Sequence, residues 1–539
     1  MGNFRVPLPQ NEPVCPYAPG TKEREDLVAS LNDLKGRKID VPMIIRGEEI
    51  RPGQPKKITA PHDHSLELGQ SYQGGPDEID KAVRAALEVK KDWEFLPWEE
   101  KAAIFLKAAD LLTGPYRHTI NAATMLSHSK TVYQAEIDAV CELADFFRFN
   151  VYYAQMIYDM QPENVRGIWD RMDYRPLEGF VFAVTPFNFV SIAGNLPTSP
   201  AIMGNTVLWK PASSVTYTAY FLMQIFKEAG LPDGVINMVT ARGADIGEMV
   251  LKNRDLAGIH FTGSTAVFQT MWRTVGTNIA DYRAYPRIVG ETGGKDFIFV
   301  HKSADIEATA TAIIRGAFEY QGQKCSAASR AYIPRSLWGD LRDKILADMK
   351  DVKMGDVTDF SNFMNAIIDR SAYNDIVAFI DYAAKSDEAE FITGGNYDDS
   401  KGLFIEPTIV VTTNPRFKLM QEEIFGPVIT LYVYDDDDYE QTLELCDRTS
   451  PYALTGAVMA TDRQAILTAA RTLRHAAGNF YINDKPTGAV VAQQPFGGSR
   501  ASGTNDKAGS VLNMIRWTSP RAIKENFLPP GNFRYPYMG

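Results

Sequence analysis

Cys325 has the surroundings that a catalytic nucleophile needs. It lies in Gln321-Gly-Gln-Lys-Cys-Ser-Ala, a polar stretch that follows an apolar, helix-forming segment. A thiol reacts as its thiolate, and exposure in a loop beside the cation of Lys324 favours that form. The other cysteines, Cys15, Cys141 and Cys446, are more typical of small core residues.

A carboxylate and an amide could complete such a site. Glu291, in Gly290-Glu-Thr-Gly-Gly-Lys, lies between two α/β runs and precedes Cys325. A partly buried carboxylate there is a candidate general base, although Glu beside paired glycines is often only part of a turn. Asn188 follows a buried strand. Its amide either stabilises the oxyanion formed when a thiol attacks an aldehyde, or caps the next helix.

A dinucleotide could bind where a predicted strand meets a predicted helix. Gly263 and Ser264 follow the strand at 258–261, so a pyrophosphate could lie at the N-terminus of the following helix. The chain has no G-x-G-x-x-G fingerprint at this point. Lys210 follows the strand at 206–209 and either reaches ribose hydroxyls or lies on the surface.

These residues are positioned by two runs of alternating strands and helices. Such alternation, with strands that are apolar throughout, predicts parallel sheets covered on both faces. The first run has strands at 180–184, 206–209, 235–239 and 258–261 and helices at 191–203, 216–229 and 245–252. The second has strands at 297–301, 331–334 and 429–434 and helices at 304–320, 338–349, 371–384 and 463–477.

The rest of the chain gives weaker signals. Residues 1–75 look irregular, two helices are predicted within 77–112, and 118–150 has a helical pattern. Residues 155–178 lose the helical period and look like an excursion from the domain. The acidic run 435–438 is expected to be a solvated turn.

Composition narrows the class of protein. The 539 residues are 45% hydrophobic and 23% charged, as in a globular protein of several domains. The net charge of −11 argues against a nucleic-acid or anionic-membrane partner. Four cysteines and seven scattered histidines predict neither a disulfide framework nor a metal site, and fit a reducing compartment. The uncharged stretch 179–209 contains prolines and asparagines, so it is expected to be buried in the protein and not to span a membrane.

Seven short motifs stand in the order found in the aldehyde dehydrogenase superfamily, which this chain resembles along nearly its whole length. They are Pro186-Phe-Asn-Phe, Trp209-Lys-Pro-Ala, Phe261-Thr-Gly-Ser, Glu291-Thr-Gly-Gly-Lys, Gly322-Gln-Lys-Cys, Glu422-Glu-Ile-Phe-Gly-Pro and Pro495-Phe-Gly-Gly. Further segments resemble the branch that oxidises L-glutamate γ-semialdehyde, the open form of Δ1-pyrroline-5-carboxylate, in the second step of proline breakdown. They are Phe318-Glu-Tyr-Gln-Gly-Gln-Lys-Cys-Ser-Ala, Asn479-Phe-Tyr-Ile-Asn-Asp-Lys, Arg500-Ala-Ser-Gly-Thr-Asn-Asp and Arg516-Trp-Thr-Ser-Pro.

The resemblance implies an α/β fold with three parts. A Rossmann-like NAD-binding domain would comprise residues 1–154 and 179–290, and an α/β catalytic domain residues 291–500. Residues 155–178 and 501–539 would form a small β flap that pairs subunits into a homodimer or higher homo-oligomer. A separate proline dehydrogenase would act before this enzyme, because the motifs leave no room for a second barrel domain. The N-terminus has no apolar or Arg-rich leader pattern, so a cytoplasmic location is expected, although a processed mitochondrial matrix chain would look similar.

The resemblance also implies roles for individual residues. Cys325 would be the nucleophile, Asn188 and the Cys325 N–H the oxyanion hole, and Glu291 the base that activates water. Glu142 would face the substrate ammonium group. The residues implied in binding NAD are Lys210, Ser213, Phe261, Gly263, Ser264, Glu423 and Phe425, and the others implied in binding substrate are Phe189, Lys324, Ser326, Gly488, Ala489 and Phe496.

Two positions depart from the wider superfamily. Phe268 replaces a common glycine, as it does in the glutamate-semialdehyde branch. Ser213 stands where NAD-preferring members often have Glu, which leaves the choice of NAD over NADP less firmly supported. Three alternatives remain at this point: oxidation of another semialdehyde such as succinate semialdehyde, a non-catalytic dinucleotide-binding scaffold, and a cysteine esterase.

Overall fold

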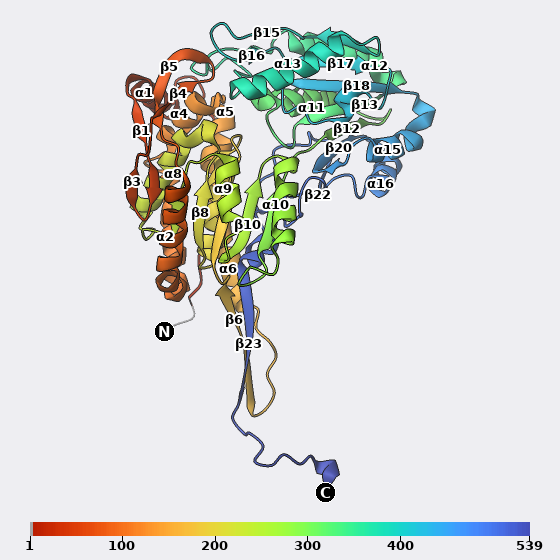
Figure 1. The fold of residues 1–539 in the computed structure, drawn as a ribbon. Coiled ribbons are helices and arrows are strands. Elements are labelled where there is room, and N and C mark those ends of the chain that lie inside the picture. Colours follow the sequence, from red (N-terminus) through yellow and green to blue (C-terminus); the bar gives the residue numbers. More distant parts are fainter. Residues whose placement is uncertain (1–3) are drawn as a thin grey trace.

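The computed structural model describes residues 4–539 and contains two α/β units, each built around a seven-stranded sheet (Figure 1). In the first sheet the strand order is β11-β10-β7-β8-β9-β2-β3. Strands β7 to β11 pair in parallel, and β2 and β3 add an antiparallel edge. Their bounds are β2 Met43–Ile45, β3 Glu48–Ile50, β7 Phe180–Val184, β8 Thr206–Lys210, β9 Ile236–Met238, β10 Leu256–Thr262 and β11 Arg287–Glu291.

Helices cover both faces of this sheet. Along β7, Val181 and Ala183 belong to one buried cluster, whereas Phe180 and Phe182 belong to another on the opposite face. A strand buried on both sides cannot show polar alternation, which explains its uninterrupted apolar sequence. The helices concerned are α2 Pro76–Phe95, α3 Trp98–Thr113, α4 Arg117–His128, α6 Leu143–Asp159, α7 Val190–Ile202, α8 Thr216–Ala229, α9 Gly243–Val250 and α10 Thr265–Thr277.

The second unit, at the upper right of Figure 1, follows the same plan. Its sheet has the order β14-β17-β18-β13-β12-β20-β21, in which β14 is the antiparallel strand. The strands are β12 Asp296–Val300, β13 Ala328–Pro334, β14 Ala389–Thr393, β17 Thr408–Thr412, β18 Val428–Tyr434, β20 Thr455–Met459 and β21 Asn479–Ile482. The helices are α11 Ile306–Phe318, α12 Arg335–Met349, α13 Arg370–Ala384, α15 Tyr439–Arg448 and α16 Arg463–Thr472. The two α/β runs predicted from the sequence are therefore present.

A two-stranded ribbon projects from the body below the first unit (Figure 1). It consists of β6 (Ile168–Pro176) and β23 (Thr518–Asn526), which pair antiparallel along their full lengths. The C-terminal tail continues beyond β23 and extends away from both sheets. This ribbon and tail lie where the sequence predicts a flap.

Two of the boundaries predicted for the flap fall inside the body of the protein. Helix α6 continues to Asp159, so the boundary placed at residue 154 falls inside a helix. Residues 501–517 also belong to the body: Gly503 bridges to Glu291, and Trp517 is fully buried. These contacts join segments far apart in the chain, which local sequence patterns do not report.

Of residues 1–75, predicted to be irregular, residues 1–3 lie outside the described residues and 4–21 form neither helix nor strand, but the prediction is wrong for residues 22–75. They contain helix α1 (Lys22–Gly36) and strands β1 (Ile39–Val41), β4 (Lys56–Ala60) and β5 (Asp63–Ser71), in addition to β2 and β3. Most of these strands are short, and β2 pairs with β9, which is distant in sequence. A local sequence pattern does not report such pairing. The pattern at 118–150 is helical but is broken at Ser129, which has a left-handed φ of 57°.

Two further expectations concern charge and membrane contact. The acidic run is a turn with a short 3-10 helix, Asp436–Asp438; Asp435 is paired with Arg335, and Asp436 accepts from Ser336. Residues 179–209 form the buried β7, α7 and β8. Among residues 4–539, no helix is long and apolar enough to cross a membrane.

Candidate active site

The loop that carries Cys325 is held in a tight conformation after α11. Tyr320 and Gln321 both have left-handed φ angles, of 52° and 56°. Gly322 also has a positive φ of 65°, and a Cβ there would lie 2.2 Å from the Gly426 carbonyl oxygen, so only glycine fits. The Gln321 amide donates to the carbonyl oxygens of Ser129 and Ala366. These contacts place the thiol at the boundary between the two units.

The thiol of Cys325 is not activated by its neighbour in the chain. Lys324 is buried and forms an ion pair with Glu319 at 3.0 Å. Burial, and then the charges of Asp296, Glu291 and Glu423, raise the pKa of Cys325 well above its ordinary value. The expected thiolate-promoting effect of Lys324 is thus absent from this arrangement. Cys325 itself is only partly exposed.

Asn188 lies against the same loop. Its side chain is 2% exposed, and its Nδ2 atom donates to the main-chain oxygen of Gln323 at 3.1 Å. The alternative that Asn188 caps α7 is wrong, because Asp138 accepts from the N–H groups of Val190 and Ser191 at 3.0 and 2.9 Å. One N–H of the Asn188 amide remains free of a partner within residues 4–539, at the edge of the Cys325 loop.

Glu291 is the last residue of β11 and lies between the turn at Gly263 and the C-terminal part of the body. Its carbonyl oxygen accepts from the Gly263 N–H at 3.2 Å, and its carboxylate accepts from the Gly498 N–H at 3.2 Å. Burial raises the pKa of this carboxyl well above its ordinary value, opposed by the Gly498 N–H and by Lys507. A carboxyl with a raised pKa is suited to accept a proton from water.

A cavity of about 1230 Å³ extends from Cys325 to the first unit. The predicted residues Lys210, Phe261, Gly263, Ser264, Glu423, Phe425, Asn188 and Cys325 line it. Ser213 is exposed and is not among the lining residues of the described chain, although its neighbour Ala212 is. The sequence reasoning missed the lining residues of α9 and α10, among them Ala244 and Val267, because their apolar pattern is that of an ordinary core helix.

The cavity fits a dinucleotide. At Gly263 a Cβ would lie 2.7 Å from the Phe261 ring, so glycine keeps the backbone open to a close-lying ligand. Ser264 is the N-cap of α10, whose free N–H groups favour a phosphate at that end. Lys210 has the pKa of its amine lowered by burial and lies at the end of β8. These residues could hold the adenosine and pyrophosphate parts of a dinucleotide.

Phe268 makes a local adjustment near the base. Its ring stacks on Phe261 with centroids 5.4 Å apart. A Cβ at Gly290 would lie 2.2 Å from the Phe268 ring, so this glycine accommodates the bulky side chain next to Glu291. The departure seen in the sequence is thus matched by a glycine on the neighbouring strand.

Glu423 and Phe425 close the cavity on the side of the second unit. The Gly294 N–H donates to Glu423 at 2.9 Å, and burial raises the pKa of this carboxyl to about 7. Phe425 has a left-handed φ of 57° and meets Phe187 edge to face at 5.6 Å. Phe187 also lines the cavity and was not predicted.

The residues expected to bind substrate are all outside the lining of this cavity within the described chain. Glu142 ends a π-helix, Glu136–Glu142, and accepts from the Ser191 hydroxyl at 2.8 Å. Burial and then Asp138 raise the pKa of Glu142 to about 8. Phe189 directly follows Asn188 and is partly exposed. Glu142 therefore contacts the start of α7, and Phe189 lies between this helix and Asn188 in the chain.

An anion could bind on the side of Cys325 that Ser326 occupies. The Ser326 hydroxyl donates to that of Thr487 at 2.8 Å, which places it against the Gly488–Ala489 loop. Gly488 has a φ of 95°, and neither its N–H nor that of Ala489 has an acceptor within residues 4–539. Thr487 was not predicted, and its only signal was its place beside Gly488.

Phe496 and Lys324 have different local roles. Phe496 is partly exposed and pairs through its backbone with Ala508 at 3.0 and 2.8 Å. Lys324 is turned toward Glu319, which leaves its predicted contact with substrate without a geometric basis in this arrangement. Among the described residues, no group of His, Cys, Asp and Glu side chains could hold a metal ion.

Comparisons with known proteins identify the family of this chain. The model of the aldehyde dehydrogenase family matches residues 51–522. The mitochondrial delta-1-pyrroline-5-carboxylate dehydrogenase of Dictyostelium discoideum is 52% identical over 536 residues, covering 99% of this chain and 96% of that protein. The crystal structure of the delta-pyrroline-5-carboxylate dehydrogenase from Mycobacterium tuberculosis bound with NAD matches with a TM-score of 0.96 and 53% identity, covering 99% of both chains. Proline utilization A from Bdellovibrio bacteriovorus matches with a TM-score of 0.92 and 28% identity, covering 98% of this chain and 54% of that one. This chain therefore belongs to the aldehyde dehydrogenase family.

Proposed function

We propose that this enzyme oxidises L-glutamate γ-semialdehyde, the open form of Δ1-pyrroline-5-carboxylate, to L-glutamate with NAD. The observation that carries the proposal is the pair of polar groups beside the catalytic loop. Glu142 offers a carboxylate for an ammonium group, while Ser326 and the Gly488–Ala489 N–H groups offer donors for a carboxylate. An amino-acid aldehyde carries both charges, whereas succinate semialdehyde lacks the ammonium.

The residues of the site can carry out the two stages of the reaction. The thiolate form of Cys325 attacks the aldehyde carbon, and the Asn188 amide with the Cys325 N–H stabilises the resulting oxyanion. When NAD is bound, it would supply the acceptor for the hydride that leaves this carbon, and the substrate then remains on Cys325 as a thioester. Glu291 takes a proton from water, whose oxygen attacks the thioester carbonyl, and the Cys325 thiolate leaves as L-glutamate is released.

Lys210, Gly263 and Ser264 would hold the adenosine and pyrophosphate of NAD, and Glu423 the nicotinamide ribose. The Phe261 ring lies against the backbone of Gly263. Phe425, which also lines the cavity, would lie beside the nicotinamide ring. Ser213 does not supply the carboxylate that would repel a 2′-phosphate. The preference for NAD therefore rests on the relatives, one of which was solved with NAD bound.

We propose that the chain forms a homodimer or a higher homo-oligomer through the flap. The support is the exposure of large apolar side chains along the ribbon and tail, which water alone would cover in a single chain. They are Val165, Trp169, Phe527, Leu528, Phe533, Tyr535 and Tyr537.

The semialdehyde would come from a separate proline dehydrogenase. This chain covers only 54% of proline utilization A, so that longer protein contains a large part with no counterpart in this chain. We propose a cytoplasmic location, with the mitochondrial matrix as the alternative because the Dictyostelium relative is named mitochondrial. Fractionation of the source cells separates the two.

The first test compares NADH formation with Δ1-pyrroline-5-carboxylate and with succinate semialdehyde, for the wild type and Cys325→Ala. Turnover of the first substrate only, abolished in the variant, supports the proposal. Turnover of succinate semialdehyde alone would change the substrate and keep the mechanism. Hydrolysis of an ester in the absence of NAD, with neither aldehyde oxidised, would indicate an esterase. A chain that neither reduces NAD or NADP nor hydrolyses an ester would be a scaffold.

A further inference from the structure

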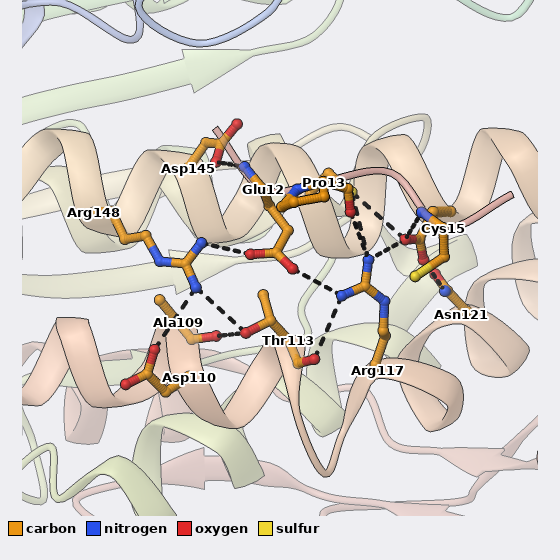
Figure 2. Close-up of polar contacts among 12 residues, drawn as sticks. Glu12, Pro13, Cys15, Ala109, Asp110, Thr113, Arg117, Asn121, Asp145 and Arg148 are labelled. Atoms are coloured by element: carbon orange, nitrogen blue, oxygen red, sulfur yellow. Dashed lines mark hydrogen bonds and ion pairs between the residues drawn. The ribbon is translucent and has the colours of Figure 1, made fainter. Parts of the chain in front are cut away.

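Residues 11–17, called here the N-terminal clasp, lie across helices of the first unit (Figure 2). The Glu12 carboxylate accepts from Arg117 at 2.8 Å and from Arg148 at 2.6 Å. The Glu12 N–H donates to Asp145 at 2.7 Å. Further along, the Cys15 N–H donates to the fully buried Glu136 at 3.0 Å. The clasp is therefore anchored by charged groups that are largely removed from water.

Asn11, at the start of the clasp, is hydrogen-bonded both to helix α6 and to the segment 491–493. No other side chain among the described residues is hydrogen-bonded to both. Its Nδ2 atom donates to the Asp145 carboxylate at 2.8 Å and to the Val491 carbonyl oxygen at 2.9 Å. The Gln493 amide donates to the Asn11 Oδ1 atom at 2.9 Å. Both ends of the Asn11 side chain are thus used in contacts with distant segments.

The two segments are the ones that carry the groups for substrate charge. Asp145 lies about one helical turn after Glu142, whose carboxylate faces the ammonium in the proposed function. Val491 and Gln493 follow Gly488 and Ala489, whose N–H groups face the carboxylate. Asn11 therefore sets the separation between the binding groups for opposite charges.

We infer that Asn11 is a positioning residue that makes the enzyme specific for aldehydes bearing both an ammonium and a carboxylate group. This inference rests on the proposed function. The clasp lies outside residues 51–522, the part that matches the family as a whole, whereas the Dictyostelium relative covers 99% of this chain. A segment that serves recognition of a charged amino-acid aldehyde has no task in an enzyme for uncharged aldehydes, which accords with this distribution.

The test compares L-glutamate γ-semialdehyde with pentanal, which has the same carbon chain and neither charge, and with 5-oxopentanoate, which lacks only the ammonium. In Asn11→Ala we expect KM for the semialdehyde to rise by about tenfold, the effect of losing one or two hydrogen bonds. Its kcat and the kcat/KM for pentanal stay within about twofold. Asn396→Ala, which removes a surface asparagine bonded to Glu406, is the matched control and leaves all three substrates unaffected.

Two further variants separate positioning from simple loss of structure. Asn11→Asp keeps the shape of the side chain but sets a carboxylate against Asp145, so its effect on KM should exceed that of Asn11→Ala. Gln493→Ala removes only an exposed partner and keeps the fold, and should raise the same KM by a smaller factor. An Asn11→Asp variant with wild-type KM would overturn the inference.

The outcomes also distinguish this inference from the proposed function. Equal losses for the semialdehyde and pentanal in Asn11→Ala, or no loss for either, would show that Asn11 does not set specificity. If the wild type itself does not prefer the semialdehyde over pentanal, the proposed function fails, and the inference fails with it. If Asn11→Ala, Asn11→Asp and Gln493→Ala all prefer the semialdehyde over pentanal by the same factor as the wild type, the inference fails and the proposed function stands.

Discussion

At the residue scale, the reactivity of Cys325 depends on the carboxyl groups around it. Because burial and these charges raise its pKa, the thiolate fraction in the protein without cofactor should keep rising with pH beyond the ordinary thiol range. Glu423→Gln removes one of the charges that raise the pKa, so alkylation of Cys325 by iodoacetamide should become faster at a given alkaline pH. Intact-protein mass spectrometry follows the reaction, with Cys325→Ala identifying the modified site.

Glu422→Gln is the matched control for this prediction, because Glu422 is the exposed neighbour of Glu423 and is not among the main groups that raise the pKa of the thiol. Its alkylation curve should follow that of the wild type. If Glu423→Gln and Glu422→Gln accelerate the reaction equally, the electrostatic explanation is wrong.

Glu142 predicts a pH dependence in substrate binding. Its pKa is raised to about 8, so the carboxyl is neutral below this pH and negative above it. Only the negative form attracts an ammonium, and therefore KM for L-glutamate γ-semialdehyde should fall as pH rises toward about 8. A bound ammonium stabilises the carboxylate, which places the apparent midpoint below that value.

Steady-state KM measured across this pH range checks the prediction, with Glu142→Gln and 5-oxopentanoate as controls. Glu142→Gln should have a high KM for the semialdehyde, and only the pH dependence that the substrate itself brings. The KM for 5-oxopentanoate should not improve as the carboxylate ionises. Identical pH profiles for the wild type and Glu142→Gln would rule out the assigned role.

At the element scale, the N-terminus of α7 is held by a charged pair from another helix and loop. Asp138, on the π-helix, caps α7 and forms an ion pair with Lys130 at 2.7 Å. Lys130 is fully buried and also lies over the rings of Phe189 and Tyr320, at 4.5 and 4.4 Å. This pair thus connects the helix that follows Asn188 to the loop that carries Cys325.

Removing one member of this pair should cost more than removing both. Lys130→Met leaves the Asp138 carboxylate buried without its cation, and should lower the free energy of unfolding by roughly 3–5 kcal/mol. The double variant Lys130→Met/Asp138→Asn has neither charge of this pair, so no unpaired charge is left at this position and part of the loss should be recovered. Urea unfolding followed by fluorescence measures both, and a double variant less stable than Lys130→Met would contradict this account.

At the scale of the whole molecule, the flap and tail have few contacts with the rest of their own chain. The apolar side chains of the tail, such as Leu528 and Tyr537, are 75% and 84% exposed. Deletion of residues 527–539 should therefore weaken self-association, because this surface is then missing from the proposed subunit interface. Light scattering should show the wild type at a multiple of 60.0 kDa and the truncated chain shifted toward one chain.

A control substitution tests whether any exposed ring has this effect. Tyr397→Ser removes a half-exposed tyrosine from β15 (Tyr397–Asp398), near the top of Figure 1 and far from the ribbon. It should leave the mass unchanged. A wild type that remains a single chain at micromolar concentration would rule out the homo-oligomer.

The sequence alone determined the α/β plan and indicated the candidate catalytic groups. Strands such as β7 and β8 are buried on both faces, so their apolar sequence and the helices between them were visible without a structure. The family motifs indicated Cys325, Glu291 and Asn188 as candidates, because the proposed catalysis requires particular side chains at these points. Local patterns of this kind depend on neighbours along the chain.

Only the tertiary structure decided how distant segments change these residues. It showed that Lys324 pairs with Glu319 and does not activate the thiol. It brought the short strands near the N-terminus into sheets, and it returned residues 501–517 to the body through Gly503 and Trp517. It also placed Asn11 between Asp145 and Val491. The physical reason is the same in each case: burial, ion pairing and sheet pairing arise between segments that are far apart in sequence, and no local pattern records them.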